Sequence, residues 1–293
     1  MKKISKKIVF FGSGPVAFSS LDFLSKYLSI EAVITKTVPA HHKKEAPVET
    51  LAKKLNLPII FANTKKELDE IIDNHNFESR LGIIVDYGVI VSDKIINKFE
   101  LGILNSHFSL LPQWRGADPI TFSVLSGQSK TGVSLMLIEP TLDTGKLIAQ
   151  ESLTIKNDDT TPILTKKLVD LSNQMLINYI PKYLAGEIKP KQQIHPEKAT
   201  YSRKLTKNDG LIDWQKPAAQ IEREVRAYQG WPKSRTMIGN VNIIVIKAHV
   251  TTEYKTRLDI ICGDGNYLSI DKLIAPSGKT MSAKDFINGY KLV

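Results

Sequence analysis

Cysteine is nearly absent from the sequence, because Cys262 is the only one among 293 residues. A single cysteine cannot form an internal disulfide, and it cannot supply the thiolate cluster of a structural zinc site, so we expect no metal. No apolar run approaches the roughly 20 residues that a membrane-spanning helix needs. These absences predict a protein of a reducing compartment, either the cytoplasm or an organellar matrix, with no membrane partner.

The N-terminus resembles a secretory signal only at its start. Several lysines precede the apolar run 8–11, but Gly12, Ser13, Gly14 and Pro15 interrupt that run. A signal peptide needs an apolar stretch of about 7 to 15 residues. We therefore interpret this segment as a first buried strand that runs into a glycine turn.

Positive charge is in excess, and it is unevenly distributed. The formal net charge is +10, from 40 basic and 30 acidic residues. Residues 201–293 hold 15 of the basic and 9 of the acidic residues. A basic C-terminal third is typical of proteins that bind a polyanion such as RNA. On charge alone, lysine-rich solubility is an equal alternative.

The first half of the chain alternates between short apolar strands and helices. This βαβ rhythm predicts an α/β fold with a doubly wound, mostly parallel sheet, in which ligands bind beyond the carboxyl ends of the strands. Asn105 is expected to end one of these strands. The predicted strands are 8–11, 32–35, 59–61, 81–85, 102–105 and 132–138, and the predicted helices are 18–28, 47–55, 65–75 and 161–184.

The last third of the chain has a different pattern. Residues 186–200 are polar, contain two prolines and have little periodicity, as in a linker. Beyond them, many short strands with one helix predict a small β-barrel. At 293 residues the length suits two domains. The predicted strands are 206–214, 236–249, 258–262 and 267–273, and the predicted helix is 218–228.

Asn105, His107 and Asp143 are the candidate catalytic residues. Asn105 and His107 are two positions apart in an extended segment, so their side chains point to one side. Asp143 lies in a Leu-Asp-Thr-Gly run that favours a turn. An amide and an imidazole can hold the oxyanion of a tetrahedral intermediate, and a carboxylate can orient the imidazole. The alternatives are a histidine with no task and an aspartate that only forms a turn.

Other residues allow two interpretations each. Gly12 and Gly14 fit the start of a dinucleotide-binding glycine pattern, but no acidic residue follows clearly at the expected distance, and close packing of strand against helix explains them equally well. Arg115 either pairs with a nearby carboxylate or meets an anionic ligand. Lys43 and Lys44 either form a solvated face or contact phosphates.

Several longer motifs carry a family resemblance that covers nearly the whole chain. FFGSGPVAFSSLDFL and VDYGVIV stand in the first half, GILNSHFSLLPQWRGADPI and LDTG in the centre, and TYSRKLTKNDGLIDW, IEREVRAYQGWP and LIAPSGKTMSAKDFINGY in the C-terminal part. Together they resemble the methionyl-tRNA formyltransferases. The central stretch is shared with other folate-dependent formyltransferases. The C-terminal motifs favour the methionyl-tRNA formyltransferases among them.

The resemblance implies a Rossmann-like catalytic domain over 1–187, a linker over 188–204 and an OB-like tRNA-binding domain over 205–293. It implies 10-formyltetrahydrofolate as the formyl donor and initiator methionyl-tRNA as the acceptor, in translation initiation. It places Asn105, His107 and Asp143 at the catalytic positions. The implied contacts are, for the folate, Tyr87, Gly88, Ser109, Leu110, Leu111 and Pro112, and, for the tRNA, Lys43, Lys44 and Arg115. We expect a monomer.

The sequence departs from the family pattern in places that do not touch the catalytic positions. The loop KTVPAHHKKEAP is shorter than in the family and lacks arginine, which leaves open how it discriminates tRNA. Asp118 and Thr141 stand where the family has a small residue and a glycine. The run 228–232 also differs slightly from the common form.

The implied reaction is direct transfer without a covalent enzyme intermediate. Asn105 and a protonated or proton-donating His107 would stabilise the oxyanion, and Asp143 would hold the imidazole and help to relay a proton, directly or through water. Two rivals stand beside this hypothesis. One is a formyltransferase for an amino-sugar nucleotide or another small amine, and the other is an RNA-binding protein that keeps an inactive folate fold.

Overall fold

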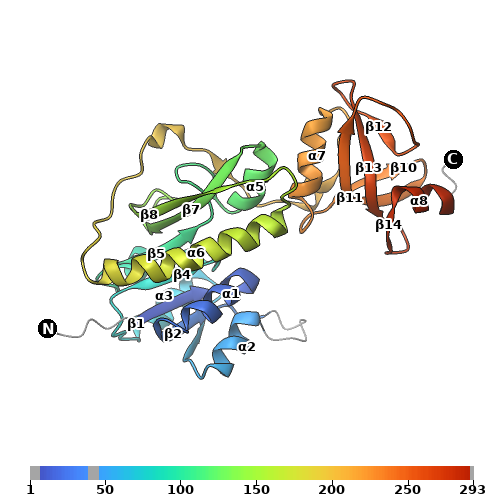
Figure 1. The fold of residues 1–293 in the computed structure, drawn as a ribbon. Coiled ribbons are helices and arrows are strands. Elements are labelled where there is room, and N and C mark those ends of the chain that lie inside the picture. The colour runs from blue at the N-terminus through green and yellow to red at the C-terminus, as the bar shows by residue number, and fades with distance from the viewer. Residues whose placement is uncertain (1–6, 39–45, 291–293) are drawn as a thin grey trace. The chain divides into compact units, whose positions relative to one another are not determined.

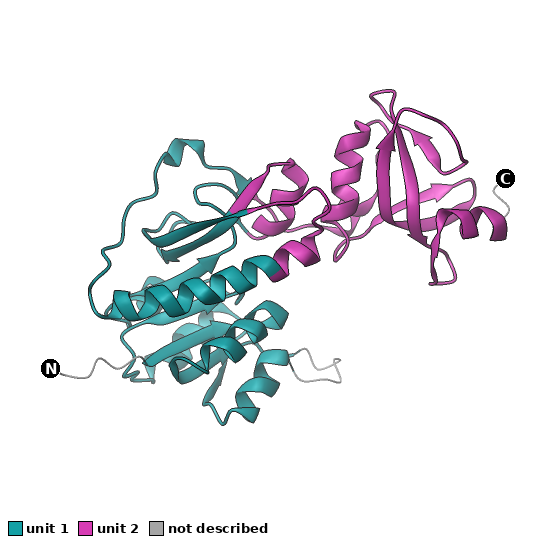
Figure 2. Ribbon diagram, viewed as in Figure 1, with its two compact units in different colours: residues 1–116, 132–153, 167–201 teal, residues 117–131, 154–166, 202–293 magenta. Residues whose placement is uncertain are grey.

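The computed structural model describes residues 7–38 and 46–290. Two compact units can be distinguished in it (Figure 2). Unit 1 comprises residues 1–116, 132–153 and 167–201, and unit 2 comprises 117–131, 154–166 and 202–293. Within the described ranges, no helix has both the length and the apolar character that a membrane span requires.

Unit 1 is built on a seven-stranded sheet with the order β3-β2-β1-β4-β5-β7-β8 (Figure 1). The first five of these strands pair in parallel, whereas β5 and β7 are antiparallel. The predicted Rossmann-like, doubly wound and mostly parallel sheet is confirmed. The strands are β1 (Lys7–Gly12), β2 (Ser29–Thr35), β3 (Ile59–Phe61), β4 (Gly82–Val85), β5 (Ile103–His107), β7 (Lys130–Leu137) and β8 (Leu147–Thr154).

The central strands are buried on both faces, which explains their continuous apolar sequences. Residues 8–12 of β1 and all of β4 are buried. Helix α6 lies along the sheet (Figure 1), and Tyr183 near its end donates a hydrogen bond to the carbonyl of Leu101 at 2.9 Å. The helices of the first half are α1 (Gly14–Leu24), α2 (Pro47–Lys54), α3 (Lys65–Asp73), α4 (Asp93–Ile96), α5 (Pro119–Ser126) and α6 (Thr161–Leu184).

Gly12 shows why the chain has a glycine where β1 meets α1. A Cβ atom at this position would lie 2.6 Å from the Cβ of Ala17 and 2.9 Å from the carbonyl oxygen of Val85. Gly14 has a φ of 76°, a left-handed conformation that favours glycine. Close packing and backbone conformation therefore account for both glycines without a nucleotide.

Unit 2 contains a five-stranded antiparallel sheet with the order β10-β11-β13-β12, and β14 pairs with β13. The pairing of β11 with β13 has register shifts near Lys247, and α7 buries Ala218, Ile221 and Val225 in the core cluster. The sheet is a half-barrel consistent with the predicted OB-like domain. The elements are α7 (Ala218–Ala227), β10 (Ser234–Ile238), β11 (Val241–Thr251), β12 (Asp259–Ile261), β13 (Tyr267–Ile274), β14 (Thr280–Ser282) and α8 (Ala283–Gly289).

Two strand predictions in this region are wrong. Within 206–214, residues Lys207–Gly210 form a 3₁₀ helix, because Thr206 and Asp209 make a reciprocal capping box that stabilises a helical turn. The single strand predicted over 236–249 is a hairpin of β10 and β11, which turns at Gly239 with a φ of 56°.

The polar stretch expected to be a linker belongs to unit 1 and is hydrogen-bonded to other parts of this unit for part of its length. Lys191 and Leu147 exchange two backbone hydrogen bonds of 2.7 and 2.9 Å. The carbonyl of Thr200 accepts a hydrogen bond from the backbone N–H of Arg115 at 2.9 Å. The short strands β6 (Arg115–Gly116) and β9 (Tyr201–Ser202) form a two-stranded sheet there. This stretch therefore lies against the loops that follow β5.

Candidate active site

Strand β5 presents Asn105 and His107 on one face. It lies between β4 and β7 and continues to His107, so Asn105 does not end the strand as predicted. The hydroxyl of Ser106, between them in sequence, is 2.7 Å from the hydroxyl of Ser172 on α6. Because alternate side chains of a strand point to opposite faces, the amide and the imidazole leave the sheet on the side away from this serine pair.

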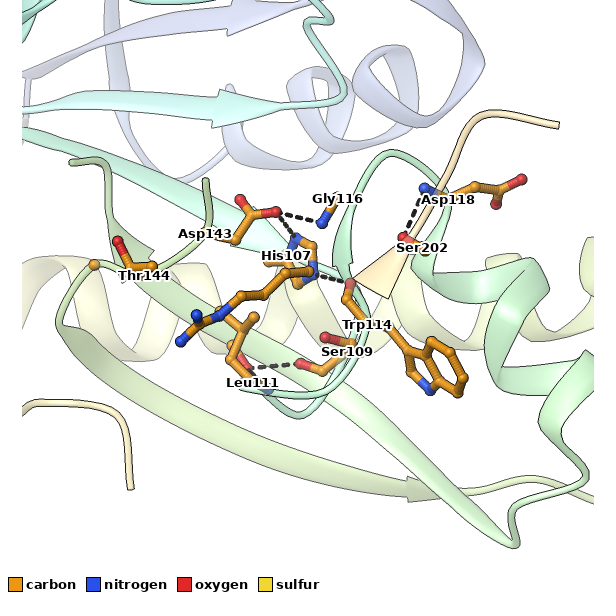
Figure 3. Close-up of polar contacts among 12 residues, drawn as sticks. His107, Ser109, Leu111, Trp114, Gly116, Asp118, Asp143, Thr144 and Ser202 are labelled. Carbon is orange, nitrogen blue, oxygen red and sulfur yellow. Dashed lines mark hydrogen bonds and ion pairs between the residues drawn. The ribbon is translucent and has the colours of Figure 1, made fainter. Parts of the chain in front are cut away.

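The imidazole of His107 lies between a carbonyl and a carboxylate (Figure 3). His107 is 5% exposed. Its Nε2 atom is 3.0 Å from the carbonyl oxygen of Trp114, and its Nδ1 atom is 3.8 Å from Oδ2 of Asp143. A carbonyl oxygen can only accept, so Nε2 carries a proton and the neutral ring has a free lone pair on Nδ1. The structure thus brings His107 and Asp143 together from segments 36 residues apart in sequence.

Asp143 is held in place through its other contacts. The backbone N–H of Gly116 donates a hydrogen bond of 2.7 Å to Oδ2 of Asp143. Asp143 and Trp114 both have a left-handed backbone, with φ values of 51° and 53°. Such conformations cost about 1 to 3 kcal/mol for residues with a side chain and are concentrated at functional sites. The two groups that face the imidazole therefore both lie on strained backbone.

Burial controls the protonation of His107. Removal of the ring from water lowers its pKa below the usual value of 6.5, and the nearby Asp143 carboxylate and the Trp114 hydrogen bond oppose this shift. The ring is therefore neutral at neutral pH and offers the Nδ1 lone pair on the side of Asp143.

Asn105 completes the group with a free amide. Its side chain is half-buried and makes no hydrogen bond to any residue within 7–38 and 46–290. A primary amide provides two N–H donors and one acceptor. The three candidate catalytic residues together therefore offer a donor, a proton acceptor and a carboxylate.

Polar side chains of β7 and β8 hold the backbone of the loop that follows His107. Ser134 Oγ donates to the carbonyl of Ser109 at 2.6 Å and accepts from the N–H of Leu111 at 3.1 Å. Gln150 Nε2 donates to the carbonyl of Leu111 at 3.0 Å. Ser109 and Leu111 are buried, whereas Leu110 and Pro112 keep some exposed surface.

Tyr87 and Gly88, two of the expected folate contacts, have very different surroundings. The Tyr87 side chain is 1% exposed, its hydroxyl donates to the carbonyl of Ala62 at 3.0 Å, and burial raises its pKa well above the usual 10. Its ring packs edge-on against Phe11 with centroids 5.9 Å apart. Gly88 is exposed. The tyrosine side chain is part of the core, and the glycine is at the surface.

Arg115 is buried, and its Nη2 atom donates to Oε1 of Gln193 at 2.7 Å. The expected tRNA contact by this side chain stays a prediction. Lys43 and Lys44 lie outside the described residues. In the part of the chain that the structure describes, no group of three or more His, Cys, Asp or Glu side chains is arranged to hold a metal ion.

Three functional groups of the site could not be predicted from residue types. The Trp114 carbonyl and the Gly116 N–H belong to the backbone, and nearly every residue type supplies such groups. Gln193 lies in a polar stretch that carries no motif, and nothing in its sequence surroundings indicates that it is buried.

Comparisons with known protein families cover both units. The formyl transferase family matches residues 6–180, and the C-terminal domain of formyl transferases matches residues 204–291.

Curated relatives match over most of the chain. Methionyl-tRNA formyltransferase of Methylococcus capsulatus is 35% identical in an alignment of 262 positions that covers 84% of this chain and 83% of that protein. Methionyl-tRNA formyltransferase of Enterococcus faecalis is 32% identical in an alignment of 304 positions that covers 97% of this chain and 96% of that protein.

Solved structures share the fold. One of them is the N-formyltransferase of Helicobacter canadensis in complex with folinic acid and dTDP-3-aminofucose. Its TM-score is 0.69 at 19% sequence identity, and the match covers 91% of this chain and 98% of the Helicobacter chain. At this identity the likeness shows the fold alone. The family matches and the curated relatives show more: this chain belongs to the methionyl-tRNA formyltransferase family and is a formyl-transferring enzyme.

Proposed function

We propose that the chain transfers the formyl group of 10-formyltetrahydrofolate to the α-amino group of initiator methionyl-tRNA, in translation initiation. The observation that carries this proposal is the His107 ring held between the Trp114 carbonyl and the Asp143 carboxylate, beside the free amide of Asn105. Family membership supports the substrates, because the curated relatives carry this activity in their names.

The contacts of His107 favour a neutral ring at the start of the reaction. Nε2–H is engaged by the Trp114 carbonyl, so Nδ1 is the nitrogen that can exchange a proton with substrates. A neutral Nδ1 accepts a proton before it can donate one, whereas the family resemblance implies a protonated or proton-donating imidazole. Asn105 is then the oxyanion donor already in place before the reaction, and His107 becomes a second donor once it is protonated.

The proposed transfer passes through one tetrahedral intermediate. The α-amine nitrogen forms a bond to the formyl carbon, whose carbonyl becomes an oxyanion held by the Asn105 amide. The proton lost by the amine passes to Nδ1 of His107, and Asp143 stabilises the imidazolium that forms. Collapse of the intermediate breaks the bond from the formyl carbon to N10 of the folate, and the proton on Nδ1 passes to N10. The enzyme returns to its starting protonation.

Burial divides the proposed folate contacts into residues that can touch the ligand and residues that lie behind the surface. Gly88, Leu110 and Pro112 have exposed surface that a ligand can touch. Tyr87, Ser109 and Leu111 are buried, so their part in the folate site is to set the shape of its wall. The fixed carbonyls and amides of residues 109–111 suit a pocket that does not rearrange on binding.

The tRNA contacts are proposed at Lys43, Lys44 and Arg115 and on the basic C-terminal region, which we propose as the tRNA-binding domain over 205–293 after a catalytic domain over 1–187. Phosphate contacts by lysine and arginine fix position without reading bases. We also propose that the protein acts as a monomer, in the cytoplasm or an organellar matrix, and without membrane contact.

Formylation assays with alternative acceptors test this function. The purified chain, supplied with 10-formyltetrahydrofolate, should formylate initiator methionyl-tRNA faster than elongator methionyl-tRNA. It should not formylate a dTDP-linked amino sugar at a comparable rate. Preference for the sugar nucleotide would favour the small-amine enzyme, and folate binding without transfer to any acceptor would favour an inactive RNA-binding protein.

A further inference from the structure

Gln193 connects the loop of Asp143 to the segment after β5. Its Nε2 atom donates to the carbonyl of Asp143 at 2.8 Å and to the carbonyl of Gly145 at 3.0 Å. Its Oε1 atom accepts from Nη2 of Arg115 at 2.7 Å. Gln193 is 7% exposed. One buried amide thus engages both polar atoms and reaches two carbonyls of the turn that carries Asp143.

The orientation of this amide is defined by its neighbours. A guanidinium can only donate, so the amide oxygen faces Arg115 and the NH₂ group faces the two carbonyls. The backbone hydrogen bonds between Lys191 and Leu147 fix the chain two residues before Gln193. The backbone near Gln193 and its side-chain amide are therefore both held by hydrogen bonds. The amide cannot turn without breaking a buried hydrogen bond, which costs about 1 to 3 kcal/mol.

We propose that Gln193 is a positioning residue for the reaction, which acts by fixing the turn that directs the Asp143 carboxylate toward His107. The inference rests on the proposed function of that pair. The turn needs support because Asp143 has a φ of 51°, and its carboxylate must stay within reach of a ring nitrogen 3.8 Å away. The Gly116 N–H holds the carboxylate itself, and Gln193 holds the backbone that carries it.

Substitution at two adjacent glutamines tests the proposal. Gln193→Met keeps the length of the side chain and removes both donors and the acceptor, and Gln193→Glu keeps the acceptor for Arg115 but removes the donors. Gln192→Met is the matched control, because Gln192 is its exposed neighbour. Both Gln193 variants should lower kcat by about 10- to 100-fold, because a misplacement of about 1 Å at a reacting centre can cost about 100-fold in rate. KM for each substrate should stay within about twofold.

A double-mutant cycle separates positioning from general damage. If Gln193 acts through Asp143, Gln193→Met should have little further effect on kcat in an Asp143→Asn background. Full additivity of the two effects, or wild-type kcat in Gln193→Met, would overturn the proposal. A Gln193→Met protein that does not fold is replaced in the cycle by Gln193→Glu.

A measurement that does not depend on formyl transfer tests the role of Gln193 separately from the proposed function. Titration of the His107 ring by NMR should show a lower pKa in Gln193→Met than in wild type or Gln192→Met, because a displaced Asp143 no longer raises the pKa. An unchanged titration would contradict the positioning role even if formyl transfer were confirmed. Failure of the wild-type chain to formylate methionyl-tRNA would instead contradict the proposed function and leave this measurement valid.

Discussion

Nδ1 of His107 and Oδ2 of Asp143 lie 3.8 Å apart, beyond the length of a hydrogen bond, across a buried gap. With a neutral ring, both atoms are acceptors, and nothing draws them closer. Protonation of Nδ1 would create a donor that faces a carboxylate. The geometry therefore suits a proton that arrives during the reaction and leaves before it ends.

Removal of the Asn105 amide should slow the chemical step. Asn105→Ala is expected to lower kcat by about 100- to 1,000-fold, the typical cost of losing an oxyanion donor. Its amide has no hydrogen bond to described residues, so the melting temperature should change little. Rapid-quench measurement of single-turnover formyl transfer would check this, and a change confined to KM would contradict it.

Asp143→Asn tests the carboxylate while it preserves the shape of the side chain. The amide oxygen of the substituted side chain can still accept from the Gly116 N–H, so the loop should remain folded. Loss of the negative charge removes the stabilisation of the imidazolium, and we expect kcat to fall by about 100-fold or more. Steady-state kinetics with saturating substrates measure this effect, and activity near that of wild type would show that the charge is not needed.

The protonation of His107 should be visible in the stability of the protein. The pKa of His107 in the folded state is below 6.5, so the unfolded chain binds a proton more readily than the folded one. The wild type therefore loses stability as pH falls below about 6.5. His107→Gln lacks this loss. The difference in unfolding free energy between wild type and His107→Gln should therefore favour wild type more at about pH 7.5 than at about pH 5.5. Urea denaturation at both pH values provides the test, and a difference that grows as pH falls would mean a raised pKa.

Lys43 and Lys44 should contribute to the salt dependence of tRNA binding. Each phosphate contact adds about 0.7 to 0.9 to the slope of log affinity against log salt concentration. The double substitution Lys43→Ala and Lys44→Ala should therefore reduce this slope by about 1 to 2. Filter binding of methionyl-tRNA across a salt series measures it. An unchanged slope would assign these lysines to the solvated face of a loop.

The sheet could be predicted from sequence because its strands are short apolar runs between clear turns. β3 and α6 have the predicted bounds, and the other predicted elements of the first half differ at their ends by a few residues. Helix α5 and strand β8 were not predicted. β8 has a single buried residue, Ile148, and its other residues are half-buried or exposed, and α5 is a short apolar helix without a distinct polar face.

The site was predictable only for its side chains. Asn105 and His107 are close in sequence, and their spacing places them on one face. The pairing of His107 with Asp143 required the family resemblance, because spacing says nothing about a contact between distant loops. The Trp114 carbonyl and the Gly116 N–H have no residue signature, and the burial of Gln193 depends on tertiary contacts.

Single-turnover formyl transfer from 10-formyltetrahydrofolate to initiator methionyl-tRNA, compared between wild type and His107→Ala, tests the central claim most directly. The account predicts rapid transfer by wild type, and transfer slowed by about 100-fold or more in the variant with unchanged tRNA affinity. Transfer by His107→Ala at close to the wild-type rate would contradict it.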